Sequence, residues 1–191
     1  MYHSLHANLI LAYHGCDERV GKRLLQGAKF KPSTNDYDWL GPGIYFWEAN
    51  PNRAWSFAKE QQARGRVKKP FVVGAVLSLG TCIDTLSESS IEAIAYAHAA
   101  LKKRLARQRQ PMPKNVGKDL LLKRLDCAVI NQLHDMSAAA GIQKADSLRG
   151  LYFEGRPLYR TAAFYEKSHV QICIVNPACI KGVFYVPQVV S

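Results

Sequence analysis

Long apolar runs are missing from this chain of 191 residues. The longest, such as Phe71 to Leu79, are far shorter than the roughly 20 residues that a membrane-spanning helix needs, so we expect no membrane partner. The first residues, Met1 to Leu11, lack a basic start followed by a long apolar run and a small-residue cleavage site. We therefore expect a cytoplasmic protein, and this length favours a single domain over residues 1–191.

Paired cysteines and clustered metal ligands are also missing. The five cysteines form no CxxC pair, and an odd number cannot be fully paired within one chain. Cys127 lies in an apolar stretch, where cysteine usually serves as a small core residue. The sequence therefore predicts reduced cysteines and no metal site.

Two common nucleotide-binding motifs do not occur in the sequence. There is no GxGxxG and no GxxxxGK followed by Ser or Thr, so a Rossmann or P-loop site has no support. Any nucleotide must be held by a different arrangement.

Acidic residues are few: 15 Asp and Glu stand against 26 Lys and Arg, a formal net charge of +11. Nine of the cations lie between Lys102 and Arg124, a segment in which Asp119 is the one acidic residue. Such a field favours an anionic partner, and we interpret this segment as a candidate nucleic-acid-binding region. The alternative is an exposed helix face that only keeps the protein soluble.

The pattern of apolar residues predicts a mixture of strands and helices. Helical spacing marks Asp17–Gln26, a helix capped by Asn50 and started by Pro51, Ser90–Arg109, and about Lys118–Ala140. Strand patterns mark Leu9–Tyr13 with His14 at its end, Ile44–Trp47, Phe71–Leu79, Gly150–Phe153, His169–Val175 and Gly182–Val186. The near-continuous apolarity of Phe71–Leu79 predicts a strand buried on both faces, which we expect at the sheet centre.

This order is neither a regular βαβ alternation nor all-β. It predicts an α+β fold with a mixed, mainly antiparallel sheet core, flanking helices and a basic helical insertion at about 88–141.

The strongest local feature is Tyr13-His14-Gly15, followed by Gly41-Pro-Gly43-Ile-Tyr45-Phe46 and then a helix containing Ala54-Trp-Ser-Phe-Ala. In these motifs the chain resembles the diphtheria-toxin-like ADP-ribosyltransferases, a family that includes the poly(ADP-ribose) polymerases. The resemblance implies that family's split-sheet fold and NAD as co-substrate. It covers the N-terminal third clearly and the last quarter loosely.

The resemblance also implies roles for individual residues. His14 would hydrogen-bond a ribose hydroxyl, Gly15 would leave its backbone open to the nicotinamide amide, and Tyr45 would stack on the nicotinamide ring. The flanking residues of the two motifs, Tyr13, Gly43 and Phe46, would complete the NAD-binding surface together with His169.

The third catalytic position lies on the late strand, where the family usually has Glu and this chain has Gln171. Alternation places His169, Gln171 and Cys173 on one face of that strand. A glutamine can still hydrogen-bond a ribose hydroxyl but cannot offer a negative charge, so elongation into a polymer is not expected. Glu166 is the alternative source of a carboxylate.

The expected function is transfer of one ADP-ribose unit from NAD to a macromolecule, with nucleic acid, RNA included, favoured over protein as the acceptor. A small basic transferase suits a bacterial toxin, an effector or a phage-defence enzyme, for which an inhibitory antitoxin or immunity protein would be a natural partner. Two alternatives remain open: an NAD glycohydrolase, and a catalytically silent module that binds ADP-ribose or nucleic acid.

Overall fold

The structure is a computed structural model that describes residues 9–117 and 121–187. It contains a single sheet of seven strands, with four α-helices in the described part of the chain. The strands are β1 (Leu9–Asp17), β2 (Ile44–Glu48), β3 (Pro70–Ser78), β4 (Cys82–Asp84), β5 (Ser147–Tyr152), β6 (His169–Ile174) and β7 (Ile180–Tyr185). The helices are α1 (Glu18–Leu25), α2 (Pro51–Ala63), α3 (Glu88–Arg107) and α4 (Arg124–Ala139).

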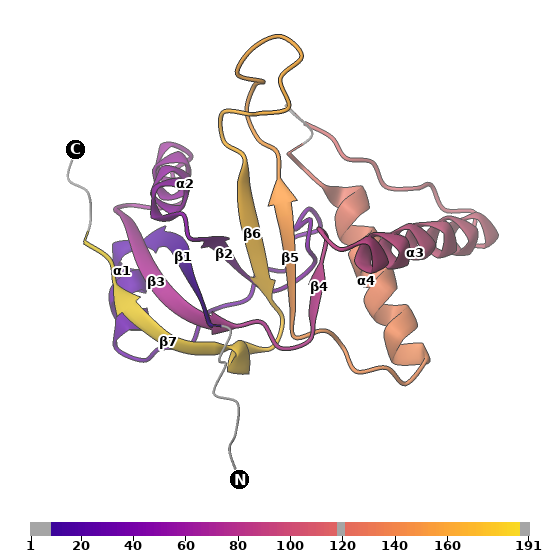
Figure 1. Ribbon diagram of the computed structural model, residues 1–191, viewed down its shortest axis with the longest axis horizontal. Coiled ribbons are helices and arrows are strands. Elements are labelled where there is room, and N and C mark those ends of the chain that lie inside the picture. The colour runs from indigo at the N-terminus through magenta and orange to yellow at the C-terminus, as the bar shows by residue number, and fades with distance from the viewer. Residues whose placement is uncertain (1–8, 118–120, 188–191) are drawn as a thin grey trace.

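The strands follow the order β4-β5-β6-β2-β1-β3-β7 across the sheet. Every pairing is antiparallel except that of β4 with β5. Helices α1 and α2 lie at the end of the sheet that carries β3 and β7, whereas α3 and α4 pack beside β4 at the opposite end (Figure 1). The expected α+β class with a mainly antiparallel sheet is therefore confirmed.

Helix starts follow the capping residues in the sequence. The side chain of Asp17 accepts a hydrogen bond from the backbone N–H of Arg19 at the start of α1, and that of Asn50 accepts one from Arg53 at the start of α2. Pro51 occupies the first turn of α2, where its missing N–H has no helical partner to lose. These local signals place both helices where the sequence predicts them.

Two expectations about the strands were wrong. Strand β1 continues past Tyr13 to Asp17, so His14 lies within the strand and not at its end. Strand β3 is not central, because it lies between β1 and β7 while β2 occupies the middle of the sheet.

The apolar run of β3 is explained by burial on both faces. On one face, Phe71 and Val73 pack against Leu24 of α1. On the other, Val72 packs with Ala54 of α2. The continuous apolar run of β3 therefore reflects its coverage by α1 on one face and α2 on the other. Such coverage does not require a central position in the sheet.

The two long helices between β4 and β5 follow the predicted segments approximately. Helix α3 ends at Arg107. Helix α4 begins at Arg124, later than the expected start near Lys118, which lies outside the described residues. The helix starts late because Leu122 is extended and forms a β-bridge with Val116. Helices α3 and α4 pack on each other through Ala97, Leu101, Val129 and Leu133. None of the helices in the described ranges is both long enough and apolar enough to cross a membrane.

Candidate functional site

A pocket of about 360 Å³ opens where β1, β2 and β6 run side by side. His14 of β1, Tyr45 of β2 and Gln171 of β6 all line it, although they come from distant parts of the sequence. Trp47 pairs with both Tyr13 and Gln171, so the side chains of Tyr45 and Gln171 lie on one face of the sheet. His14, the residue after Tyr13, reaches the pocket beside the backbone of Tyr45, whose carbonyl oxygen it contacts. The three expected catalytic residues are therefore brought together in one cavity.

His14 is held in a defined tautomer. Its Nδ1 lies 2.9 Å from the carbonyl oxygen of Tyr45, so Nδ1–H donates and the neutral ring keeps Nε2 as an acceptor. Phe30 and Phe46 pack against the ring with centroid distances of 5.4 and 5.7 Å. Burial lowers the pKa of His14, and the hydrogen bond to the carbonyl of Tyr45 offsets this only in part. The side chain is thus an uncharged hydrogen-bond acceptor at neutral pH.

Tyr45 is fixed through its hydroxyl group. The hydroxyl donates to the carbonyl oxygen of Gly41 at 2.8 Å and accepts from the backbone N–H of Leu40 at 3.1 Å. Burial raises its pKa well above the ordinary value of 10, so the group stays protonated. Because the hydroxyl is committed to the loop, the ring is what Tyr45 contributes to the pocket.

Gln171 is oriented at both ends of its amide. Its Oε1 accepts from the indole N–H of Trp39 at 2.6 Å, and its Nε2 lies 3.0 Å from Nε2 of His169. Since Nδ1 of His169 faces the carbonyl of Lys167 at 2.6 Å, Nδ1–H donates there and Nε2 accepts from Gln171. The pocket is built for an amide at this position, with donor and acceptor each matched.

The other residues expected to contact NAD divide into two groups. Gly43 lines the pocket, whereas Tyr13, Gly15, Phe46 and His169 are not among its lining residues. Phe46 is fully buried and supports the His14 ring, and His169 supports Gln171 from behind. Gly15 faces α2, where an added methyl group would overlap the carbonyl oxygen of Ala54. Of these four residues, Phe46 and His169 support lining residues, whereas Tyr13 and Gly15 lie outside the lining of the pocket.

An ion network that the sequence analysis missed forms one wall of the pocket. Arg53 of α2 is only 8% exposed, and its Nη2 lies 2.7 Å from the carboxylate of Glu154 while Nη1 lies 3.5 Å from Glu60. Lys167 donates to Glu60 at 2.9 Å. The spacing of Arg53 and Glu60, two helical turns apart, places both on one face of α2 and was the signal available in the sequence.

The neighbouring cations keep the carboxylate of Glu60 ionised. Burial alone would raise the pKa of Glu60, but the hydrogen bond from Lys167 and the charge of Arg53 outweigh it and lower the pKa. Within the described residues, Nε and Nη1 of Arg53 and the indole N–H of Trp47 are buried without a hydrogen-bond acceptor. These donors are enclosed by protein, and the wall presents the paired carboxylates of Glu60 and Glu154 to the pocket.

Glu166, the alternative carboxylate, is directed elsewhere. Its side chain accepts from the backbone N–H and the guanidinium of Arg156, both at 3.1 Å, in the exposed loop between β5 and β6. It does not line the pocket, which instead contains Glu60 and Glu154. The carboxylates that line the pocket are thus Glu60, Glu154 and, from the loop before β2, Asp38.

Among the described residues of the basic segment Lys102–Arg124, Leu121 lies in the pocket lining. The ammonium of Lys123 lies 5.7 Å from the centre of the Tyr152 ring, and Arg124 pairs with Asp36 at 2.7 Å. Three exposed cations that line the pocket, Lys31, Arg64 and Arg66, come from other parts of the chain.

Comparisons with known proteins assign no family to the chain. No family model matches the chain, and no solved structure matches it significantly. A protein of Methanocaldococcus jannaschii described only as uncharacterized is 36% identical over 62 residues, which is 32% of this chain. The chain spans 28% of the length of that protein.

Proposed function

We propose that this chain is a mono-ADP-ribosyltransferase that uses NAD and transfers ADP-ribose to a macromolecular acceptor, with nucleic acid favoured over protein. The observation that carries the proposal is the meeting of His14, Tyr45 and Gln171 in one pocket, on neighbouring strands. Each presents a chemical group suited to a different part of NAD.

The pocket residues fit such a ligand. The ring of Tyr45 offers a face for the nicotinamide, and Nε2 of His14 offers an acceptor for a ribose hydroxyl. Lys31, Arg64 and Arg66 supply positive charge for the diphosphate.

NAD would supply the ADP-ribosyl group, the bond between ribose C1′ and the nicotinamide nitrogen breaking as a bond from C1′ to the acceptor forms. Nicotinamide leaves with the electron pair of the broken bond, and the acceptor loses a proton to solvent or to a nearby base. Positive charge develops on the ribose, as in glycoside hydrolysis. The residues act by positioning the reacting groups and by stabilising this charge.

Gln171 in this scheme holds a ribose hydroxyl and supplies no charge. Glu60 and Glu154 line the same pocket, but the charges of Arg53 and Lys167 balance theirs, so they replace little of the negative charge that an amide lacks. Because Gln171 carries no charge, we expect a single transfer per acceptor site and no elongation into a polymer. A role as a toxin, effector or phage-defence enzyme, with an inhibitory partner, fits this chemistry.

The test is incubation with NAD labelled in its adenylate portion, in the presence of separate pools of RNA, DNA and protein. We expect the label in a nucleic acid pool, with equimolar nicotinamide release. Nicotinamide release without label in any pool would establish an NAD glycohydrolase instead. Binding of NAD or ADP-ribose without nicotinamide release would establish a silent binding module.

A further inference from the structure

A second basic surface, absent from the linear charge pattern, forms where α1 meets the turn between α2 and β3. It consists of Arg19, Lys22 and Arg23 of α1, Lys59 of α2, and the cations of residues 64–69. The backbone N–H of Glu18 donates to the carbonyl of Lys69 at 2.8 Å, which joins the two segments. We call these residues the α1/α2 basic face.

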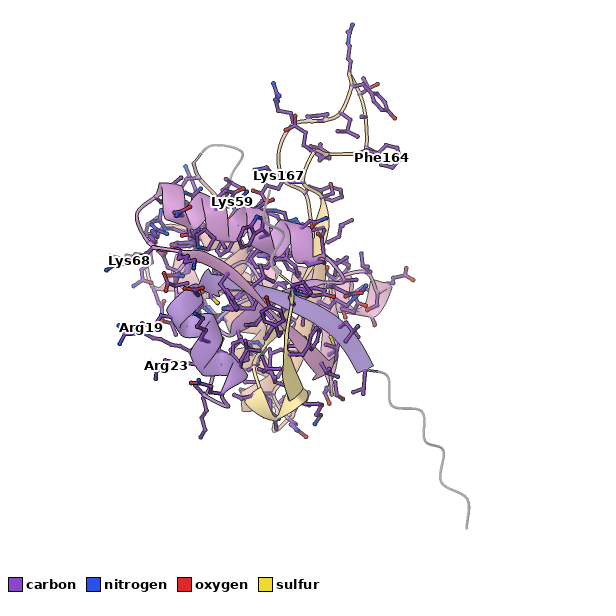
Figure 2. All side chains as sticks on the ribbon, turned by 90° about the vertical axis from the view of Figure 1, so that its left-hand side faces the viewer. Arg19, Arg23, Lys59, Lys68, Phe164 and Lys167 are labelled. Carbon is purple, nitrogen blue, oxygen red and sulfur yellow. The ribbon has the colours of Figure 1, made fainter. Side chains whose placement is uncertain are left out.

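Most of its positive charge is unneutralised. Glu18 pairs with Lys22 at 3.4 Å and Lys69 at 2.9 Å, and Glu60 is turned inward toward Lys167. Within the described residues, the side chains of Arg19 and Arg23 form no ion pair. Figure 2 shows Lys68, Arg19 and Arg23 along the left edge of the molecule, with Lys59 above them on α2.

The face continues into the pocket. Arg64 and Arg66 belong both to the face and to the lining of the cavity, and Lys31 lines the same cavity from the loop after α1. By contrast, Leu121 is the lining residue that the described part of Lys102–Arg124 contributes. A polyanion bound along the face would therefore lead to the site of transfer, whereas the cations of α3 lie at the opposite end of the sheet (Figure 1).

We infer that the α1/α2 basic face binds the phosphodiester backbone of a nucleic acid strand and delivers it to the pocket as the acceptor. The role of the strand as acceptor rests on the proposed function, but binding of the strand can be measured without NAD. The face has the charge of a backbone-binding surface. An anionic membrane is disfavoured because Val20 is the one large apolar side chain of α1 that is exposed.

The experiment uses a variant that removes four charges from the face without touching a pocket residue. Its substitutions are Arg19→Gln, Arg23→Gln, Lys59→Gln and Lys68→Gln. Binding of fluorescent single-stranded RNA and single-stranded DNA of one sequence is measured by anisotropy at several salt concentrations. We expect binding at least about tenfold weaker, and a salt dependence smaller by up to about 3 in log–log slope, since each phosphate contact on a single strand contributes about 0.7. Unchanged nicotinamide release without acceptor and an unchanged thermal midpoint confirm that the pocket and fold are intact.

The matched control removes the same number of charges from α3. Its substitutions are Lys102→Gln, Lys103→Gln, Arg104→Gln and Arg107→Gln. We expect nucleic acid binding within about twofold of the unmodified protein, because no residue of α3, which the structure describes in full, lines the pocket and α3 lies at the end of the sheet opposite to α1 (Figure 1).

The outcomes separate the alternatives. Equal losses in both variants, or a loss in the α3 variant alone, would overturn the inference, as would binding of phosphatidylserine vesicles in place of oligonucleotides. Preferential binding of RNA over DNA, or the reverse, would identify the strand chemistry while supporting the face. If the face variant loses binding but the unmodified protein releases no nicotinamide, the face stands and the transferase proposal fails.

Discussion

Replacing Gln171 by glutamate tests how the third catalytic position is built. The amide accepts from Trp39 and donates to His169, whose own Nδ1–H is committed to the carbonyl of Lys167. A carboxylate keeps the first contact but cannot donate to Nε2 of His169. The lost hydrogen bond costs about 1 kcal/mol, and two acceptors then face each other unless the ring takes up a proton.

The proton makes the effect depend on pH. Burial lowers the pKa of His169 in the present protein, so its ring is neutral above pH 6.5. In Gln171→Glu the new carboxylate raises the folded-state pKa of His169 above the unfolded value. The resulting stabilisation is present below that unfolded pKa and is lost as pH rises through the folded one. Keeping an imidazolium at pH 8 costs up to about 2 kcal/mol, the value for an ordinary histidine pKa of about 6.5, and less as the folded-state pKa rises.

We therefore expect Gln171→Glu to lower the free energy of unfolding by about 2–3 kcal/mol at pH 8, and by about 1 kcal/mol or less at pH 5.5. Urea unfolding at both pH values measures this, with Gln171→Met as a control that removes both hydrogen bonds without adding charge. A loss for Gln171→Glu that is equal at the two pH values would refute the proposed hydrogen-bond relay.

Three further predictions follow from the same geometry. Tyr45→Phe should cost about 1–3 kcal/mol of stability, because the buried N–H of Leu40 loses its acceptor, yet keep NAD turnover within a few-fold; a severe loss of turnover in the folded variant would show that the hydroxyl acts chemically. Gly15→Ala should lower stability by about 3 kcal/mol or more in urea unfolding, since the backbone of α2 must move, whereas Gly182→Ala, with open space around it, should change little; similar effects would contradict the packing. Nicotinamide release should stay constant from pH 8 to 6.5 and fall at lower pH, because the pKa of His14 is lowered and protonation removes its acceptor; a midpoint at or above 6.5 would argue against this role.

Helices and strands with clear end signals were predictable from the sequence. Asp17, Asn50 and Pro51 mark helix starts, and the alternation in His169–Ile174 gave the face that Gln171 occupies. The position of β3 in the sheet was not predictable, because burial by helices and central position produce the same apolar pattern. Strand β4 has only three residues, too few to show a period.

The residues of the candidate site that belong to short motifs were predictable from the sequence. The residues that join the site through contacts between distant segments were not. The glycines and His14 and Tyr45 stand in compact motifs, whereas Trp39 lies in a loop with no periodic signal. Glu154 enters the site only because β5 and β6 pair and bring it to Arg53. The α1/α2 basic face was not predictable from the sequence, because its two halves are separated in sequence and are joined by the contact of Glu18 with Lys69.

Nicotinamide release by the unmodified protein and by His14→Ala is the measurement that tests the central proposal most directly. The account predicts measurable release by the unmodified protein and a loss of about a hundredfold in the variant, because the ribose is no longer positioned. Thermal unfolding of both proteins shows whether the variant is folded, and Tyr45→Phe serves as a neighbouring substitution that should retain release. Near-normal release by folded His14→Ala, or no release by the unmodified protein with any acceptor, would contradict the assignment of this pocket as an NAD site for transfer.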